Sequence, residues 1–149
     1  DFSYCFCDCS SLTSIPTGLF DNNTAVTDFS YCFSSCSSLA SIPSGLFDNN
    51  TAVTTFGYCF YNCSSLTEIP QQLFMYNTEV TTFRYCFYRY TSNTFGFTLY
   101  IGSTKVINAA SFVYYNGSYT RKIYAPSGST TYTTFYNLRS SLRLTVYTY

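Results

Sequence analysis

The sequence predicts an α/β solenoid whose coils of 27 residues combine short strands with helical turns, followed by a β-rich C-terminal cap. Tyr4, Tyr31, Tyr58 and Tyr85 are each 27 residues apart, and the residues around them match. A unit of this length cannot bury its own apolar face, so each unit must stack on the next. With 46% hydrophobic and 9% charged residues among 149, the chain is also too apolar to be disordered.

Identical residue types recur in columns through residues 1–90, which hold three full repeats and part of a fourth. We expect like side chains of successive coils to lie on one another and form one elongated core. Each fully buried side chain would contribute about 1.5–3 kcal/mol. The clearest columns are Phe6, Phe33, Phe60 and Phe87, and Cys5, Cys32, Cys59 and Cys86.

Within one coil the pattern predicts a short strand at 26–29, a helical turn at 31–36 and a second strand at 39–42. Pro43 suits the first position of a one-turn helix, because proline has no N–H to donate. Asparagines mark the bend that follows, where they tolerate left-handed backbone and can bond along the stack. They are Asn22, Asn23, Asn49, Asn50 and Asn77.

Residues 91–149 leave the 27-residue period and are predicted to form the β-rich cap, packed on the last repeat. Apolar and polar residues alternate over 97–101, as in a half-buried strand. Asn116 and Gly117 separate the strand-like runs 112–115 and 118–124, which predicts a β-hairpin.

The end of the cap is predicted to contain a helix and a last strand. The serines of 127–129 can cap a short helix that places Tyr132, Phe135 and Tyr136 over the cap. Alternation of apolar and polar residues over 142–147 then indicates a final strand.

The phrase Tyr-Cys-Phe-x-x-Cys-Ser-Ser-Leu-x-x-Ile-Pro carries a resemblance across residues 1–90. It resembles the BspA-like leucine-rich repeats of bacterial cell-surface proteins, in which F-x-x-C-x-S-L-x-x-I recurs. Residues 122–129, followed by Tyr132, resemble the strand–turn–helix that commonly closes such arrays. Where the family reads I-x-I-P, this chain has only Ile-Pro, as at Ile15-Pro16, so a shorter strand is expected.

The resemblance implies leucine-rich-repeat-like coils in a secreted or surface-exposed protein. Such a protein binds components of a host, a matrix or a neighbouring cell, as protein or glycan ligands, without chemistry of its own. The expected localisation is therefore extracellular or at the cell surface.

Enzyme chemistry is disfavoured by the residue types that the sequence lacks. Without histidine, the chain cannot build Ser-His-Asp or Cys-His nucleophiles or histidine-containing zinc sites. No glycine-rich phosphate loop occurs, and the carboxylates recur in similar environments, which gives no acid and base with separated pKa values. We predict a non-enzymatic protein without a cofactor.

The eight cysteines allow three interpretations: structural thiols, disulfides or a metal site. A C-x-x-x-C spacing recurs at Cys5/Cys9, Cys32/Cys36 and Cys59/Cys63. On a helical turn this spacing places both sulfurs on the buried side, where cysteine behaves as a small hydrophobe, so we favour structural thiols. Cys7 has no cysteine in its column and is expected to be the thiol that reagents reach.

All seven acidic residues precede all seven basic ones. The resulting dipole would promote head-to-tail self-association at low salt through the uncapped N-terminal repeat. We favour the alternative, a solvated charge gradient without a role. Seven scattered positive charges are too few to predict nucleic-acid binding. No apolar run approaches the ~20 residues that cross a bilayer, so no membrane insertion is expected.

The candidate binding residues form two sets. The first, the contact strip, lies on the second predicted strand of each coil and comprises Thr13, Ser14, Ala40, Ser41, Thr67 and Glu68. The second is an aromatic–basic patch for acidic glycans or other polyanions, comprising Tyr115, Tyr119, Arg121 and Lys122.

Two functions remain open from the sequence. One is a recognition or adhesion module that binds protein or glycan ligands through a repeat surface. The other is a structural spacer that extends a larger surface assembly, which the near-identity of repeats one and two favours. In repeat three, Glu68, Gln71, Gln72, Met75 and Tyr76 depart from the pattern, so binding specificity is expected there.

Overall fold

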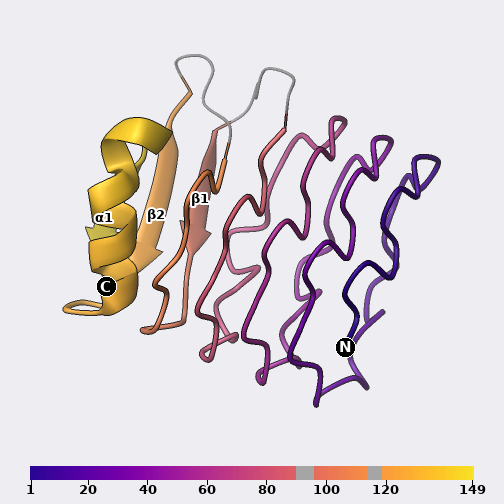
Figure 1. Ribbon diagram of the computed structural model, residues 1–149, viewed down its shortest axis with the longest axis horizontal. Coiled ribbons are helices and arrows are strands. Elements are labelled where there is room, and N and C mark those ends of the chain that lie inside the picture. The colour runs from indigo at the N-terminus through magenta and orange to yellow at the C-terminus, as the bar shows by residue number, and fades with distance from the viewer. Residues whose placement is uncertain (90–95, 114–118) are drawn as a thin grey trace.

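The computed structural model describes residues 1–89, 96–113 and 119–149. The helix and strands of these residues all follow residue 96: β1 (Phe97–Tyr100), β2 (Arg121–Ala125), α1 (Thr130–Leu142) and β3 (Thr145–Thr148). The strands form one parallel sheet in the order β1-β2-β3. Helix α1 lies beside this sheet at the end of the molecule opposite the N-terminus (Figure 1).

The predicted fold class, an α/β solenoid of leucine-rich-repeat-like coils, is wrong. The described residues form a small mixed α/β domain with one helix and a three-stranded parallel sheet. The strands expected at 26–29 and 39–42 and the helical turn expected at 31–36 are not formed. Residues 1–89 contain turns, bends and isolated bridges, such as the one between Asp28 and Thr55.

The backbone before β1 is neither helix nor strand because its N–H groups alternate between two kinds of acceptor. The N–H of Tyr31 donates to the carbonyl of Gly57 in the next segment (3.0 Å), whereas that of Cys32 donates to Phe29 within the same turn (3.1 Å). Tyr31 and Ser35 also have φ angles of 59° and 60°, in the left-handed region that α-helices and strands exclude.

The aromatic columns expected from the repeat are confirmed. The ring of Phe33 stacks on Phe6 at 5.2 Å and on Phe60 at 5.4 Å, and Phe60 stacks on Phe87 at 5.3 Å. A second row has centroid separations of 4.5, 4.4 and 4.8 Å and comprises Tyr4, Tyr31, Tyr58 and Tyr85. Residues 27 apart therefore stack on one another although they form no regular strand.

Two buried asparagines join neighbouring segments. Asn50 Nδ2 donates to the carbonyls of Phe20 (3.1 Å) and Asn23 (3.0 Å). Asn77 Nδ2 donates to the carbonyls of Phe47 (2.9 Å) and Asn50 (3.0 Å). The expected bonding of asparagines between repeats is therefore confirmed for these two residues.

In the C-terminal part, the predicted strand and capped helix are confirmed. Ser129 is the N-cap of α1, and its Oγ accepts from the N–H of Tyr132 at 3.0 Å. Because α1 continues to Leu142, the last strand begins only at Thr145.

The predicted hairpin is wrong, although its Asn116-Gly117 turn lies outside the described residues. The hairpin requires 118–124 to pair with 112–115, whereas β2 has β1 on one edge and β3 on the other and therefore has no edge free for that segment. Val113, from the expected first strand, instead forms a parallel bridge with Phe87.

The sheet is attached to the preceding chain at residues 71–75. The N–H of Tyr100 donates to the carbonyl of Gln71 (2.8 Å), and that of Gly102 donates to Phe74 (3.2 Å). A Cβ on Gly102 would overlap the carbonyl group of Met75, so this close approach requires glycine.

Candidate functional site

All six residues of the contact strip are exposed: Thr13, Ser14, Ala40, Ser41, Thr67 and Glu68. Backbone hydrogen bonds hold their segments side by side. The N–H of Ala40 donates to the carbonyl of Thr13, and that of Thr67 donates to Ala40, both at 3.3 Å. The structure therefore brings these six residues together on one surface.

The aromatic–basic patch is brought together only in part. Tyr115 lies outside the described residues, whereas Tyr119 is 47% exposed and Lys122 is half-buried. Arg121 is 1% exposed, because the side chains of β2 alternate and Arg121 shares the inner face with Ile123. Its guanidinium cannot serve the surface patch for which the sequence proposed it.

The two sets of candidate residues meet in one groove of about 550 Å³, which we call the junction groove. Glu68 of the contact strip and Lys122 of β2 both line it. The groove lies where the sheet joins the preceding chain. Its full lining is Glu68, Ile69, Pro70, Gln71, Gly96, Phe97, Thr98, Thr120 and Lys122.

The wall of the junction groove formed by β1 is fixed by close backbone contacts. The N–H of Phe97 donates to the carbonyl of Thr120 at 3.1 Å. Gly96 comes so near to Thr120 that a Cβ would collide with this carbonyl. Thr98 pairs in register with Lys122, so both side chains point to the same outer face.

The polar groups of the junction groove suit hydrogen bonding to a ligand. Glu68 supplies a carboxylate, Lys122 an ammonium group and Gln71 an amide, and Thr98 and Thr120 supply hydroxyls. Pro70 adds apolar surface, whereas Ile69 and Phe97 are almost fully buried. The lining is therefore mainly polar, which suits a polar ligand.

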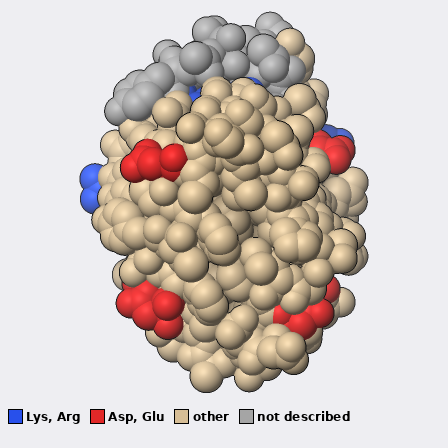
Figure 2. Space-filling model, turned by 90° about the vertical axis from the view of Figure 1, so that its right-hand side faces the viewer, with Lys and Arg blue, Asp and Glu red and all other residues tan. Residues whose placement is uncertain are grey.

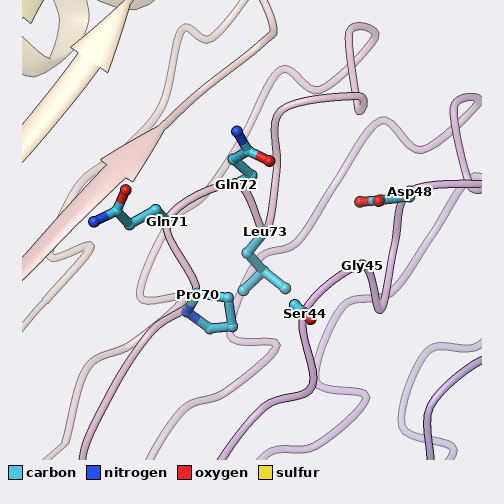
Figure 3. A pocket seen from close by; sticks show the side chains of 7 residues that line it. All are labelled: Ser44, Gly45, Asp48, Pro70, Gln71, Gln72 and Leu73. Atoms are coloured by element: carbon cyan, nitrogen blue, oxygen red, sulfur yellow. The ribbon is translucent and has the colours of Figure 1, made fainter.

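A second hollow of about 410 Å³, which we call the turn pocket, lies on the other side of Pro70 and Gln71. Figure 3 shows Asp48 pointing toward the segment of Gln72, while Gln71 extends toward the side of β1. Its lining comprises Ser44, Gly45, Asp48, Pro70, Gln71, Gln72 and Leu73.

The turn pocket occurs where the repeat pattern is broken. Gly18 and Gly45 have φ angles of 73° and 75°, whereas Gln72, at the matching position of repeat three, has no positive φ. A residue with a Cβ avoids the left-handed region, so the third turn follows another path. Burial and, to a lesser extent, the nearby Asp21 carboxylate raise the pKa of Asp48.

The eight cysteines are free thiols, and five of them are buried. Cys36 Sγ donates to the carbonyl of Phe6 and Cys63 Sγ to that of Phe33, both at 3.1 Å. Burial raises the pKa of Cys36 to about 11 and raises that of Cys63 as well. These sulfurs are protonated donors inside the core, which supports the structural interpretation.

Cys7 is not the most accessible thiol, contrary to the prediction. Cys5 and Cys9 are exposed, whereas Cys7 is half-buried and contacts a carboxylate oxygen of Asp8 at 3.5 Å. In the described ranges, no cluster of three or more Cys, Asp or Glu side chains could hold a metal ion.

Comparison of the chain with protein-family models, with curated proteins and with solved structures finds no match. The resemblance to BspA-like repeats therefore stays a prediction. Within the part of the chain that the structure describes, no helix has the length and apolar character needed to span a bilayer.

Specificity was predicted to lie in repeat three, and this stays a prediction. Gln71 of that repeat lines both hollows. The contributions of Gly96, Thr98 and Thr120 were not foreseen. Alternation in 97–101 places Thr98 outward, but no sequence signal indicates that it lies beside Glu68.

Proposed function

We propose that this chain is a non-enzymatic recognition or adhesion module, at the cell surface or outside the cell, that binds protein or glycan ligands. The contact strip and the junction groove are its binding surface. The observation that carries the proposal is that Glu68 and Lys122, from two separately predicted sets, line one groove. The exposure of the whole contact strip supports it further.

A row of exposed, mostly small side chains suits this role. The strip residues are exposed, whereas the large apolar side chains of the same segments, such as Ile15, Ile42 and Ile69, are buried in the core. A ligand can therefore lie along the strip without disturbing the packing. The groove at its end would supply charged contacts, which fix orientation and select among ligands.

The proposal is tested by screening the full chain against immobilised glycans and extracellular-matrix proteins. We expect at least one saturable ligand, whose affinity Ala40→Arg lowers about tenfold by placing a bulky charge in the strip. Ala25→Arg is the matched control, because Ala25 is also exposed but lies outside the strip. Equal effects of the two variants on binding would exclude the strip.

The alternative function, a structural spacer, is favoured by the regularity of the aromatic columns. A spacer that assembles head to tail needs complementary ends. Figure 2 views the N-terminal end, where acidic side chains lie apart near the margins with uncharged surface between them. Every lysine and arginine of the chain follows residue 83.

The two functions differ in light scattering. A spacer would form oligomers whose mass rises with protein concentration and falls with salt, because exposed charges are screened within about 10 Å at 0.1 M salt. A recognition module would bind its ligand as a species of constant mass. Salt-sensitive oligomers together with an empty ligand screen would favour the spacer.

A further inference from the structure

We propose that the junction groove binds an uncharged sugar unit of a glycan, and that the adjoining tyrosine row extends the site along the glycan. The tyrosine row comprises Tyr100, Tyr124 and Tyr147 on the outer face of the sheet. This inference rests on the proposed recognition function and names its ligand class.

The charges of the groove select against ionic ligands. Glu68 and Lys122 lie on either side of β1, since β1 bonds to Gln71 on one edge and to β2 on the other. An anion that approaches Lys122 is repelled by Glu68, and a cation that approaches Glu68 is repelled by Lys122. A neutral ligand avoids both penalties and can hydrogen-bond to both groups.

The hydrogen-bonding groups of the groove match a polyol. Each sugar hydroxyl both donates and accepts, so it is satisfied best by a site that offers both functions. Glu68 accepts, Lys122 donates, and the Gln71 amide does both. Pro70, which is half-buried, provides apolar surface for the C–H face of a sugar ring.

The tyrosine row continues the groove along the same face of the sheet. Tyr100 and Tyr124 lie two residues beyond Thr98 and Lys122, and side chains two residues apart in a strand share a face. The rings stack at 4.7 Å (Tyr100–Tyr124) and 4.9 Å (Tyr124–Tyr147).

Because the tyrosine rings cover one another, the row presents their edges and hydroxyl tips to solvent. Lys122 lines the groove, and its Nζ lies 5.9 Å from the centroid of the Tyr147 ring, so this side chain joins the groove to the row. A glycan of several units would place one sugar in the groove and the next beside these phenols. Tyrosine suits such contacts, since it combines a flat apolar body with a polar tip.

The test is an NMR titration of the full chain with neutral tetrasaccharides, namely cellotetraose, maltotetraose and mannotetraose. The comparison ligands are 3′-sialyllactose, which is acidic, and glycylglycine, which is zwitterionic. We expect saturable shifts of the Thr98 and Lys122 amides with at least one neutral tetrasaccharide and weaker binding of sialyllactose. Glycylglycine tests the rival ligand class, because its ammonium and carboxylate groups match Glu68 and Lys122.

Two variants test the assigned contacts. Glu68→Gln and Thr98→Val should each weaken binding of the neutral tetrasaccharide, the former by about tenfold because a hydrogen bond to a charged group is lost. Glu79→Gln is the control, because Glu79 is an exposed carboxylate paired with Lys105 away from the groove. Thermal unfolding of each variant shows whether its fold is retained.

Saturable binding that depends on Glu68 and Thr98 but not on Glu79 supports the inference. Tighter binding of sialyllactose or glycylglycine, or no saturable shift with any neutral tetrasaccharide, overturns it. Failure of the sugar site can be distinguished from failure of the proposed recognition function. A protein ligand that is sensitive to Ala40→Arg, found together with no saturable shift for any neutral tetrasaccharide, would uphold the function and overturn the sugar site.

Discussion

Replacing Asn50 by alanine removes a donor that joins two segments of the core. Asn50 is 0% exposed, and its Nδ2 donates to the carbonyls of Phe20 and Asn23 at 3.1 and 3.0 Å. Each of these carbonyls also accepts a backbone N–H, from Asn23 at 2.9 Å and from Val26 at 3.1 Å. The substitution therefore weakens the two acceptors without leaving either of them unsatisfied.

The expected cost follows from this partial compensation. Each lost hydrogen bond should cost about 1 kcal/mol, below the upper range for an unsatisfied buried group. The cavity left by the amide adds to this cost. Removal of Asn50 Oδ1, which is buried and accepts no hydrogen bond from the described residues, offsets part of it. We expect a loss of about 2 kcal/mol in the free energy of unfolding, or about 4–8 °C in Tm.

Urea unfolding followed by circular dichroism measures this loss as a lower midpoint with an unchanged slope. Asn49→Ala is the control, because Asn49 is exposed, and it should change the free energy of unfolding by less than about 0.5 kcal/mol. Asn50→Asp should cost more than Asn50→Ala, since its carboxylate would face two carbonyl oxygens. Equal midpoints for Asn50→Ala and Asn49→Ala would refute the reasoning.

Three further predictions concern the sheet junction, the helix cap and the thiols. Gly102→Ala should destabilise the fold far more than Gly128→Ala in thermal unfolding, because a Cβ would collide with Met75 at the first position. At the second position a Cβ meets no atom within 4 Å and costs only the strain of a positive φ of 68°; similar losses would contradict the close approach. Ser129→Ala should lower the free energy of unfolding by about 1 kcal/mol, by loss of the N-cap of α1, whereas the exposed Ser127→Ala should not. Burial raises the pKa of Cys36 to about 11, whereas the pKa of an unfolded thiol is ~8.5. Between these two pH values only the unfolded state loses the thiol proton. Stability is therefore retained below pH ~8.5 and should fall above it, by up to ~1.4 kcal/mol per pH unit for each such thiol. Urea midpoints that stay constant from pH 7 to about 9.5 under reducing conditions would contradict this protonation state.

Sequence periodicity predicted which side chains meet, but not the backbone that carries them. The column of Phe6 and Phe33 follows from the 27-residue spacing alone, because any backbone that repeats with this period stacks them. The strand expected at 39–42 was inferred from the residue pattern within one coil. The alternating hydrogen bonds and the left-handed φ of Tyr31 and Ser35 break both regular structures, and neither tyrosine nor serine signals this conformation.

The site was predictable where it depends on one strand or one repeat, and not where distant segments meet. Exposure of Thr67 and Glu68 follows from their position between the buried Leu66 and Ile69. The burial of Arg121 could also be predicted from the sequence, because alternation in Arg-Lys-Ile-Tyr-Ala places Arg121 on the same face of the strand as Ile123. The meeting of Glu68 with Lys122 depends on the docking of Tyr100 against Gln71, which no local pattern encodes.

The bonds between segments constrain how the chain length can vary. Thr54 and Thr81 each donate a side-chain hydrogen bond to the residue 27 positions earlier, and the rings of Phe33 and Phe60 stack at the same separation in sequence. Deleting residues 28–54 would set Phe6 against Phe60 and leave each remaining column with its own residue type. Deleting one residue within a repeat would shift the later residues out of alignment. Genetic changes in this region are therefore expected to insert or remove whole units of 27 residues.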